Sequence, residues 1–82
     1  MGQPRLKWGQ VERYLLRQGY EIRPAGGDKI IIAPRDGRQR SRYVVRIGHT
    51  SCDHPGTELL RCYVSRLHHV FGITIADVMR ER

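Results

Sequence analysis

The spacing of apolar positions along the chain changes several times, and each change predicts a new element. In the first segment, Trp8, Val11 and Leu15 recur at the three- and four-residue intervals of an amphipathic helix. Gly19 follows at the position where a left-handed residue commonly ends a helix. We therefore predict a first helix from Lys7 or Trp8 to about Gln18.

Three strand patterns come next, over residues 20–23, 29–33 and 42–48. Pro24 stops the first, and Gly26-Gly27 forms the turn to the second, which has three consecutive isoleucines and favours a central position in the sheet. In the third, Tyr43, Val45 and Ile47 point to one face, and Arg42, Val44 and Arg46 point to the other. Because the connections are short, we expect antiparallel hairpins.

The apolar residues within 49–56 show no regular spacing, so this segment is predicted to be an irregular loop. A second helix is expected from about Pro55 to Phe71, because proline suits a first helical turn and Gly72 follows the end. The apolar stripe expected to face the sheet is Leu60, Tyr63, Val64, Leu67 and Phe71. Thr74 and Asp77 resemble a capping box for a short last helix, which either packs on the domain or contacts a partner.

These elements predict one α+β domain over residues 1–82, in the order α-β-β-β-α with a short C-terminal helix. Eighty-two residues suffice for one modest hydrophobic core. The expected architecture is a three-stranded antiparallel sheet with two helices on one face. Arg42, Arg46 and one side of the isoleucine strand would then lie on the uncovered face.

The charge balance points to an anionic partner. Fifteen Lys and Arg residues against eight Asp and Glu give a net charge of +7, and thirteen of the fifteen are Arg. Arg pairs bidentately with phosphate and stacks on bases, so nucleic acid is the first expected partner and an acidic protein the second. Five arginines gather around the third strand: Arg35, Arg38, Arg40, Arg42 and Arg46. They are either a phosphate-binding surface or a solvated charge run.

Other classes of protein fit the sequence less well. It has no apolar run of about 20 residues for a membrane-spanning helix, and Cys52 and Cys62 do not form a disulfide framework. We therefore expect a cytoplasmic protein with reduced thiols and no membrane association. The two cysteines, together with His54, His68 and His69, fit none of the strong zinc patterns. No metal and no cofactor are predicted.

Several short segments follow one another along the chain at characteristic spacings: Gly19-Tyr20, Gly26-Gly27, Pro34, His54-Pro55-Gly56, Leu59-Leu60 and Phe71-Gly72-Ile73. Over roughly residues 6–74, their order and spacing resemble the HicA, or YcfA-like, family of mRNA interferase toxins, although no single motif among them is specific. The resemblance implies a small fold like that of double-stranded-RNA-binding domains. It also implies mRNA cleavage, and neutralisation by a HicB-type antitoxin.

The chain departs from that family at one position. The family's chemistry belongs to a His in a Gly-Ser-His-type turn between the first two strands, and counting back from Pro34 places Asp28 there. Metal-independent RNA cleavage needs a base, an acid and a cation. The candidates are Asp28 as a base if its pKa is raised, Lys29 to stabilise charge, and His49 as a replacement histidine. Alternatively, Asp28 favours the turn, Lys29 is an exposed strand residue and His49 binds the loop backbone.

Three functions therefore stay open. The first is a HicA-like toxin that binds mRNA and cleaves it as a metal-independent endoribonuclease. The second is a non-catalytic RNA-binding module on the same fold, and the third is a basic domain that binds an acidic protein. The predicted RNA contacts are Gly26, Gly27, Lys29, Arg38, Arg40, Arg42 and Arg46. We expect a monomer or a small homo-oligomer.

Overall fold

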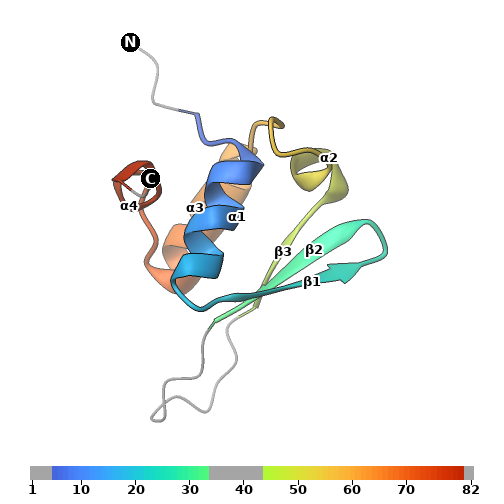
Figure 1. Ribbon diagram of the computed structural model, residues 1–82, viewed down its shortest axis with the longest axis horizontal. Helices are drawn as coiled ribbons and strands as arrows, with labels where there is room; N and C mark the ends of the chain where they lie inside the picture. Colours follow the sequence, from blue (N-terminus) through green and yellow to red (C-terminus); the bar gives the residue numbers. More distant parts are fainter. Residues whose placement is uncertain (1–4, 34–43, 81–82) are drawn as a thin grey trace.

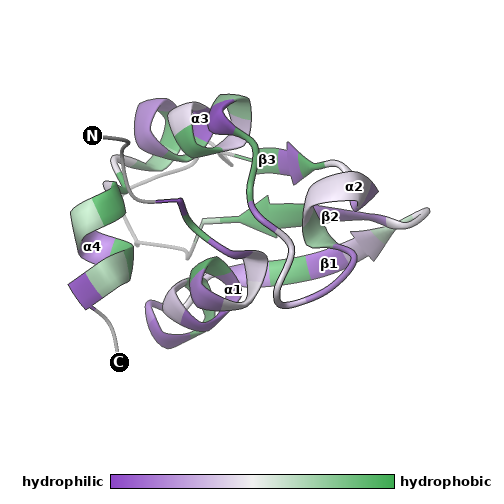
Figure 2. Cartoon of the chain, turned by 90° about the horizontal axis from the view of Figure 1, so that it is seen from above, coloured by the Kyte–Doolittle hydropathy of each residue, from purple (hydrophilic) through white to green (hydrophobic). Residues whose placement is uncertain are grey.

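The computed structural model describes residues 5–33 and 44–80 (Figure 1). Its elements are α1 (Trp8–Arg17), β1 (Glu21–Ala25), β2 (Asp28–Ile32), β3 (Val44–Ile47), α2 (His49–Cys52), α3 (Arg61–Phe71) and α4 (Ile75–Arg80). The two longer helices, α1 and α3, lie on the same face of the sheet, α1 against β1 and α3 against β3 (Figures 1 and 2). The predicted α+β class and order are confirmed, with α2 as an addition.

The sheet is antiparallel, with strand order β1-β2-β3. The isoleucine strand β2 is central, as its composition predicted. β1 differs from the expectation, because Pro24 lies inside the strand opposite Lys29 and does not end it. Proline is tolerated there because β1 is an edge strand of the described sheet, and an edge position does not need every backbone N–H as a donor.

One hydrophobic core fills the space between the sheet and the helices. Val11 and Leu15 of α1, Ile31 of β2, Ile47 of β3 and Leu67 of α3 are fully buried in it. The predicted alternation of the third strand is confirmed, because Val45 and Ile47 are buried while Val44 and Arg46 are exposed. The spacing of apolar residues therefore identified the core-facing side of α1, β3 and α3, whereas the isoleucine run of β2 did not show which of its residues would be buried.

The start of the second long helix was predicted wrongly. α3 begins at Arg61, so Leu60 is exposed and Leu59 is buried instead. Residues 53–60 run past the start of α1, where the first backbone N–H groups of a helix have no acceptors within the helix. The Trp8 N–H donates to the Thr57 carbonyl at 2.8 Å, and the Gly9 N–H to the Pro55 carbonyl at 2.9 Å. This segment of bends and turns therefore caps α1, and α3 begins only after it.

The last helix packs on the domain. α4 contacts α1, and its Val78 is buried in the core while Met79 stays exposed. The predicted capping box is confirmed: the Thr74 N–H donates to Asp77 Oδ2 at 3.0 Å, and the Asp77 N–H to Thr74 Oγ1 at 3.1 Å. Within the described residues, no helix has the length and apolar character needed to cross a membrane.

Candidate functional site

The β1–β2 hairpin ends in a two-residue glycine turn that extends past the helices toward α2 (Figure 1). Gly26 and Gly27 have φ angles of 59° and 92°, in the left-handed region that glycine adopts without strain. Two such residues suit the tight turns that join antiparallel strands. The predicted turn is therefore present, and β2 begins directly after it at Asp28.

Asp28 joins three elements at this end of the sheet. Its carboxylate accepts a hydrogen bond from Arg46 Nε of β3 at 2.8 Å and another from the backbone N–H of His49 at 2.9 Å. Its Oδ1 also lies 3.4 Å from His49 Nδ1. The strand register explains why these groups lie close together. Lys29 pairs with Ile47, which places Asp28 beside the residues that follow β3. We call Asp28, Arg46 and His49 the Asp28 cluster.

These bonds decide the charge of Asp28. The hydrogen bond from Arg46, followed by that from the His49 backbone, lowers the pKa of the Asp28 carboxyl below its ordinary value, because both favour the ionised form. The sequence had offered Asp28 as a base on the condition that its pKa was raised, and this condition is wrong. An ionised carboxylate with strong donors is a weak base, and it suits the holding of neighbouring groups.

His49 lies beside the glycine turn. A Cβ placed on Gly27 would be 3.7 Å from the Cβ of His49, so the histidine packs next to the turn on which the HicA family carries its own histidine. The His49 side chain is 68% exposed, whereas that of Asp28 is 22% exposed. The carboxylate is therefore sheltered and the imidazole accessible. With Asp28 facing Nδ1, Nε2 is the ring nitrogen left to exchange protons with a ligand.

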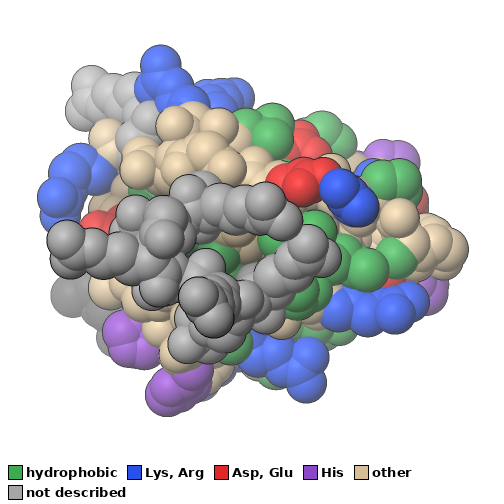
Figure 3. Space-filling model, turned by 90° about the horizontal axis from the view of Figure 1, so that it is seen from below, with side chains coloured by type: hydrophobic (Ala, Val, Ile, Leu, Met, Phe, Trp, Pro, Cys, Tyr) green, Lys and Arg blue, Asp and Glu red, His purple; other side chains and the backbone are tan. Residues whose placement is uncertain are grey.

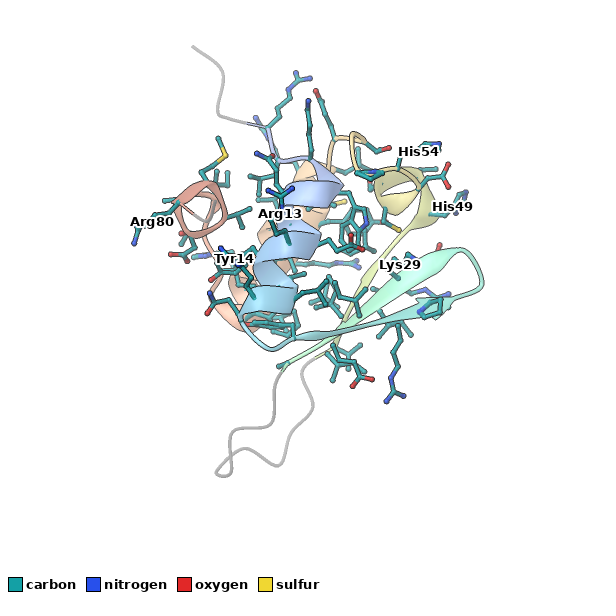
Figure 4. The ribbon with its side chains drawn as sticks, viewed as in Figure 1. Arg13, Tyr14, Lys29, His49, His54 and Arg80 are labelled. Carbon is teal, nitrogen blue, oxygen red and sulfur yellow. The ribbon has the colours of Figure 1, made fainter. Side chains whose placement is uncertain are left out.

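Lys29 is not part of the Asp28 cluster. Successive residues of a strand point to opposite faces, so Lys29 shares the helix-covered face with Ile31, while Asp28 lies on the open face. Its side chain lies between the hairpin and α2 (Figure 4). The structure thus separates two residues that the sequence had grouped as neighbours.

The cysteines and the remaining histidines form no metal site in the described part of the chain, where no three His, Cys, Asp or Glu residues gather. Cys52 is buried and donates to the Gly48 carbonyl at 3.3 Å, whereas Cys62 is exposed on α3. Burial raises the pKa of the Cys52 thiol, against the opposing effect of nearby Lys29. Cys52 is therefore a protonated packing residue of α2.

The predicted arginine surface is only partly described. Arg35, Arg38, Arg40 and Arg42 lie outside the described residues. On the described part of the open face, Arg46 pairs with Asp28 and Arg23 pairs with Glu21, while Val44 is 46% exposed. Hydrophobic, cationic and acidic side chains are accordingly mixed on this face (Figure 3).

The pairing of Arg46 with Asp28 was missed from the sequence because the two residues are 18 positions apart. The available signal was the alternation of β3, which placed Arg46 on the open face of the sheet, where the structure also places Asp28. Alternation gives the face of a residue, but not its position along the neighbouring strand, which depends on the register.

Comparison with known proteins adds no assignment. No family model, no curated protein and no solved structure matches this chain. The likeness to HicA toxins therefore stays a resemblance of segment order and spacing. The features of the molecule that bear on function are the geometry of the Asp28 cluster and the charge of the surfaces around it.

Proposed function

We propose that this protein is a HicA-like toxin that binds mRNA and cleaves it with His49 as the base. The observation that carries this proposal is the position of His49: its accessible imidazole lies against the Gly26-Gly27 turn, with Asp28 Oδ1 3.4 Å from Nδ1. The family places its histidine on that same turn. A residue from the end of β3 would here supply the ring that the turn lacks.

The cluster contains the groups that RNA cleavage requires. His49 Nε2 would take the proton of a ribose 2′-hydroxyl, and the 2′-oxygen would form a bond to the adjacent phosphorus as the bond to the 5′-oxygen breaks. The leaving 5′-oxygen takes a proton from water, and the imidazolium returns its proton to solvent. The products are a 2′,3′-cyclic phosphate and a 5′-hydroxyl, and no metal or oxidant is consumed.

Arg46 and Asp28 have supporting roles in this scheme. Arg46 donates Nε to Asp28 and Nη2 to the Ala25 carbonyl at 3.5 Å, which fixes the guanidinium at the edge of the cluster. A fixed cation stabilises the negative charge that develops on a phosphorane. Asp28 orients the imidazole through Nδ1 and acts as a positioning residue.

A protein partner follows from the same proposal. A toxin of this type needs an antitoxin, and the net charge of +7 would complement an acidic protein of the HicB type. An adjacent reading frame for such an acidic protein would support the assignment. Co-expression of the two should relieve any growth arrest that the basic chain causes alone.

The test is cleavage of a long mRNA by purified protein in the presence of EDTA. We expect His49→Gln to lower the cleavage rate about 10²–10⁴-fold, the usual contribution of a general base. His54→Gln is the matched control, because His54 is also exposed and lies 3.5 Å from the carboxylate of Asp53. Wild-type protein that binds RNA without cleaving it would overturn the proposal and leave a non-catalytic RNA-binding module.

A further inference from the structure

The outer side of α3 is a polar surface that the Asp28 cluster does not use. Six residues of the helix are exposed on the side away from Leu67: Arg61, Cys62, Ser65, Arg66, His68 and His69. At 100° per residue these positions share one broad face of the helix. No residue of α3 is Asp or Glu. We call this the α3 outer face.

The arginines of this face differ from three other arginines of the described chain, which are held in ion pairs. Arg5 pairs with Glu58, Arg23 with Glu21 and Arg46 with Asp28. By contrast, neither Arg61 nor Arg66 forms an ion pair with a described residue. Their charges are therefore uncompensated, and their donors remain available for an external anion.

The α3 outer face adjoins the strand end that carries His49. The Cζ of Arg66 lies 6.0 Å from the centre of the Tyr63 ring, at the limit of a cation–π contact. The hydroxyl of Tyr63 in turn packs on Gly48, where an added Cβ would be only 2.6 Å from it. Gly48 directly precedes His49, so a chain of contacts links the face to the proposed base.

We propose that the α3 outer face binds the phosphate backbone of the RNA strand that His49 cleaves. This inference rests on the proposed function. Arg61 and Arg66 are separated by about 7.5 Å along the helix axis, at 1.5 Å per residue, so they can engage two different phosphates. Ser65 and His69 lie on the same face and add further hydrogen-bonding groups.

The composition of the face favours RNA over a protein partner. Protein interfaces usually have a desolvated centre of apolar or aromatic side chains. The α3 outer face offers only Cys62 of that kind, surrounded by Arg, Ser and His. Phosphate contacts need no such centre, because charge supplies most of the affinity.

The experiment measures the affinity of single-stranded RNA against salt, in the His49→Gln background so that the RNA stays intact. The test variant is Arg61→Gln with Arg66→Gln. The matched control is Arg13→Gln with Arg80→Gln, which removes equal charge from the exposed surfaces of α1 and α4 (Figure 4). Two lost phosphate contacts should reduce the slope of log affinity against log salt by about 1.4 and weaken binding about tenfold at low salt. The control should change the slope by less than half as much.

Each outcome decides between distinct ideas. Equal losses in the test and control variants would mean that net charge alone acts, and would overturn the role of α3. Unchanged RNA binding in the test variant would also overturn the RNA-binding role of the α3 outer face, and an acidic protein would then be the remaining candidate partner for this face. Absence of RNA binding in the background protein would refute the proposed function as well. Loss of slope without any cleavage by wild type would support the α3 surface and refute only the catalytic proposal.

A conservative variant guards against a folding defect. Arg61→Lys with Arg66→Lys keeps both charges, and should restore most of the salt slope because counterion release depends on charge. The affinity should recover only in part, since Lys cannot form the bidentate contact of a guanidinium. Circular dichroism should show the same melting temperature for all these variants, because the substituted side chains are exposed.

Discussion

The end of the β1–β2 hairpin and the outer face of α3 both carry arginines, but among the described residues these are ion-paired in the first region and not in the second. At the hairpin end, Arg46 is bound to Asp28, which also binds the backbone of His49. On α3, Arg61 and Arg66 lack an ionic partner among the described residues. An ion-paired arginine side chain has a fixed position, and its partner partly neutralises its electrostatic field. An unpaired arginine side chain keeps its full electrostatic field and its conformational freedom. The first arrangement suits chemistry at one atom, and the second suits binding of a polyanion.

The two regions also depend on different forces, which can be tested separately. The position of α3 comes from burial of its inner side, where Leu67 is fully enclosed. The position of the hairpin end comes from glycine turn geometry and from the bonds of Asp28. Mutations on α3 should therefore act through apolar packing, and mutations at the hairpin end through backbone conformation and charge.

The largest expected effect is on α3. Leu67→Ala should reduce the free energy of unfolding by about 2–5 kcal/mol, because it removes buried surface and leaves a cavity. Chemical denaturation would measure the loss. Cys62→Ala on the exposed side of the same helix is the control, and should change stability by about 0.5 kcal/mol or less. Equal stability of the two variants would mean that the inner side of α3 does not hold the helix in place.

An intermediate effect is expected at the turn. Gly27→Ala should destabilise the protein by about 1–2 kcal/mol, because Ala at a φ of 92° brings its Cβ close to the backbone. The nearest atom beyond the turn would be His49 Cβ at 3.7 Å, an ordinary contact, so the effect comes from the backbone alone. Gly56→Ala is the control, since its Cβ would meet nothing within 4 Å. A neutral Gly27→Ala would show that the turn is not held in this conformation.

The smallest effect is a dependence on pH. The pKa of Asp28 is lower in the folded protein than its ordinary value of 3.8, so its ionised form stabilises the fold at pH values above that number. As the pH falls below it and the carboxyl gains a proton, this contribution is lost. Wild type should therefore unfold at a higher temperature than Asp28→Asn at pH 7, and the difference should shrink in acid. A difference that is constant from pH 7 to pH 3 would contradict the ionic role of Asp28.

Local patterns predicted the elements well and their ends less well. The periods placed Val11, Leu15, Val45 and Leu67 in the core, and glycine at the helix ends and the turn was interpreted correctly. Leu60 was misplaced because a helical pattern continues upstream of the true start of α3. The groups that prevent an earlier start of α3 are distant in sequence. The N–H groups of Trp8 and Gly9 donate hydrogen bonds to the carbonyls of Thr57 and Pro55, which an earlier helical turn would need as its own acceptors.

The candidate site shows the same division. By itself the sequence predicted the Gly26-Gly27 turn, offered Asp28 and His49 as candidate site residues, and established the basic character of the chain. Only the tertiary structure decided that Asp28 is held ionised by Arg46, that His49 lies against the turn, and that Lys29 points to the other face. The reason is physical: period and turn preference act between neighbours in sequence, whereas strand register and charge pairing depend on groups that folding brings together.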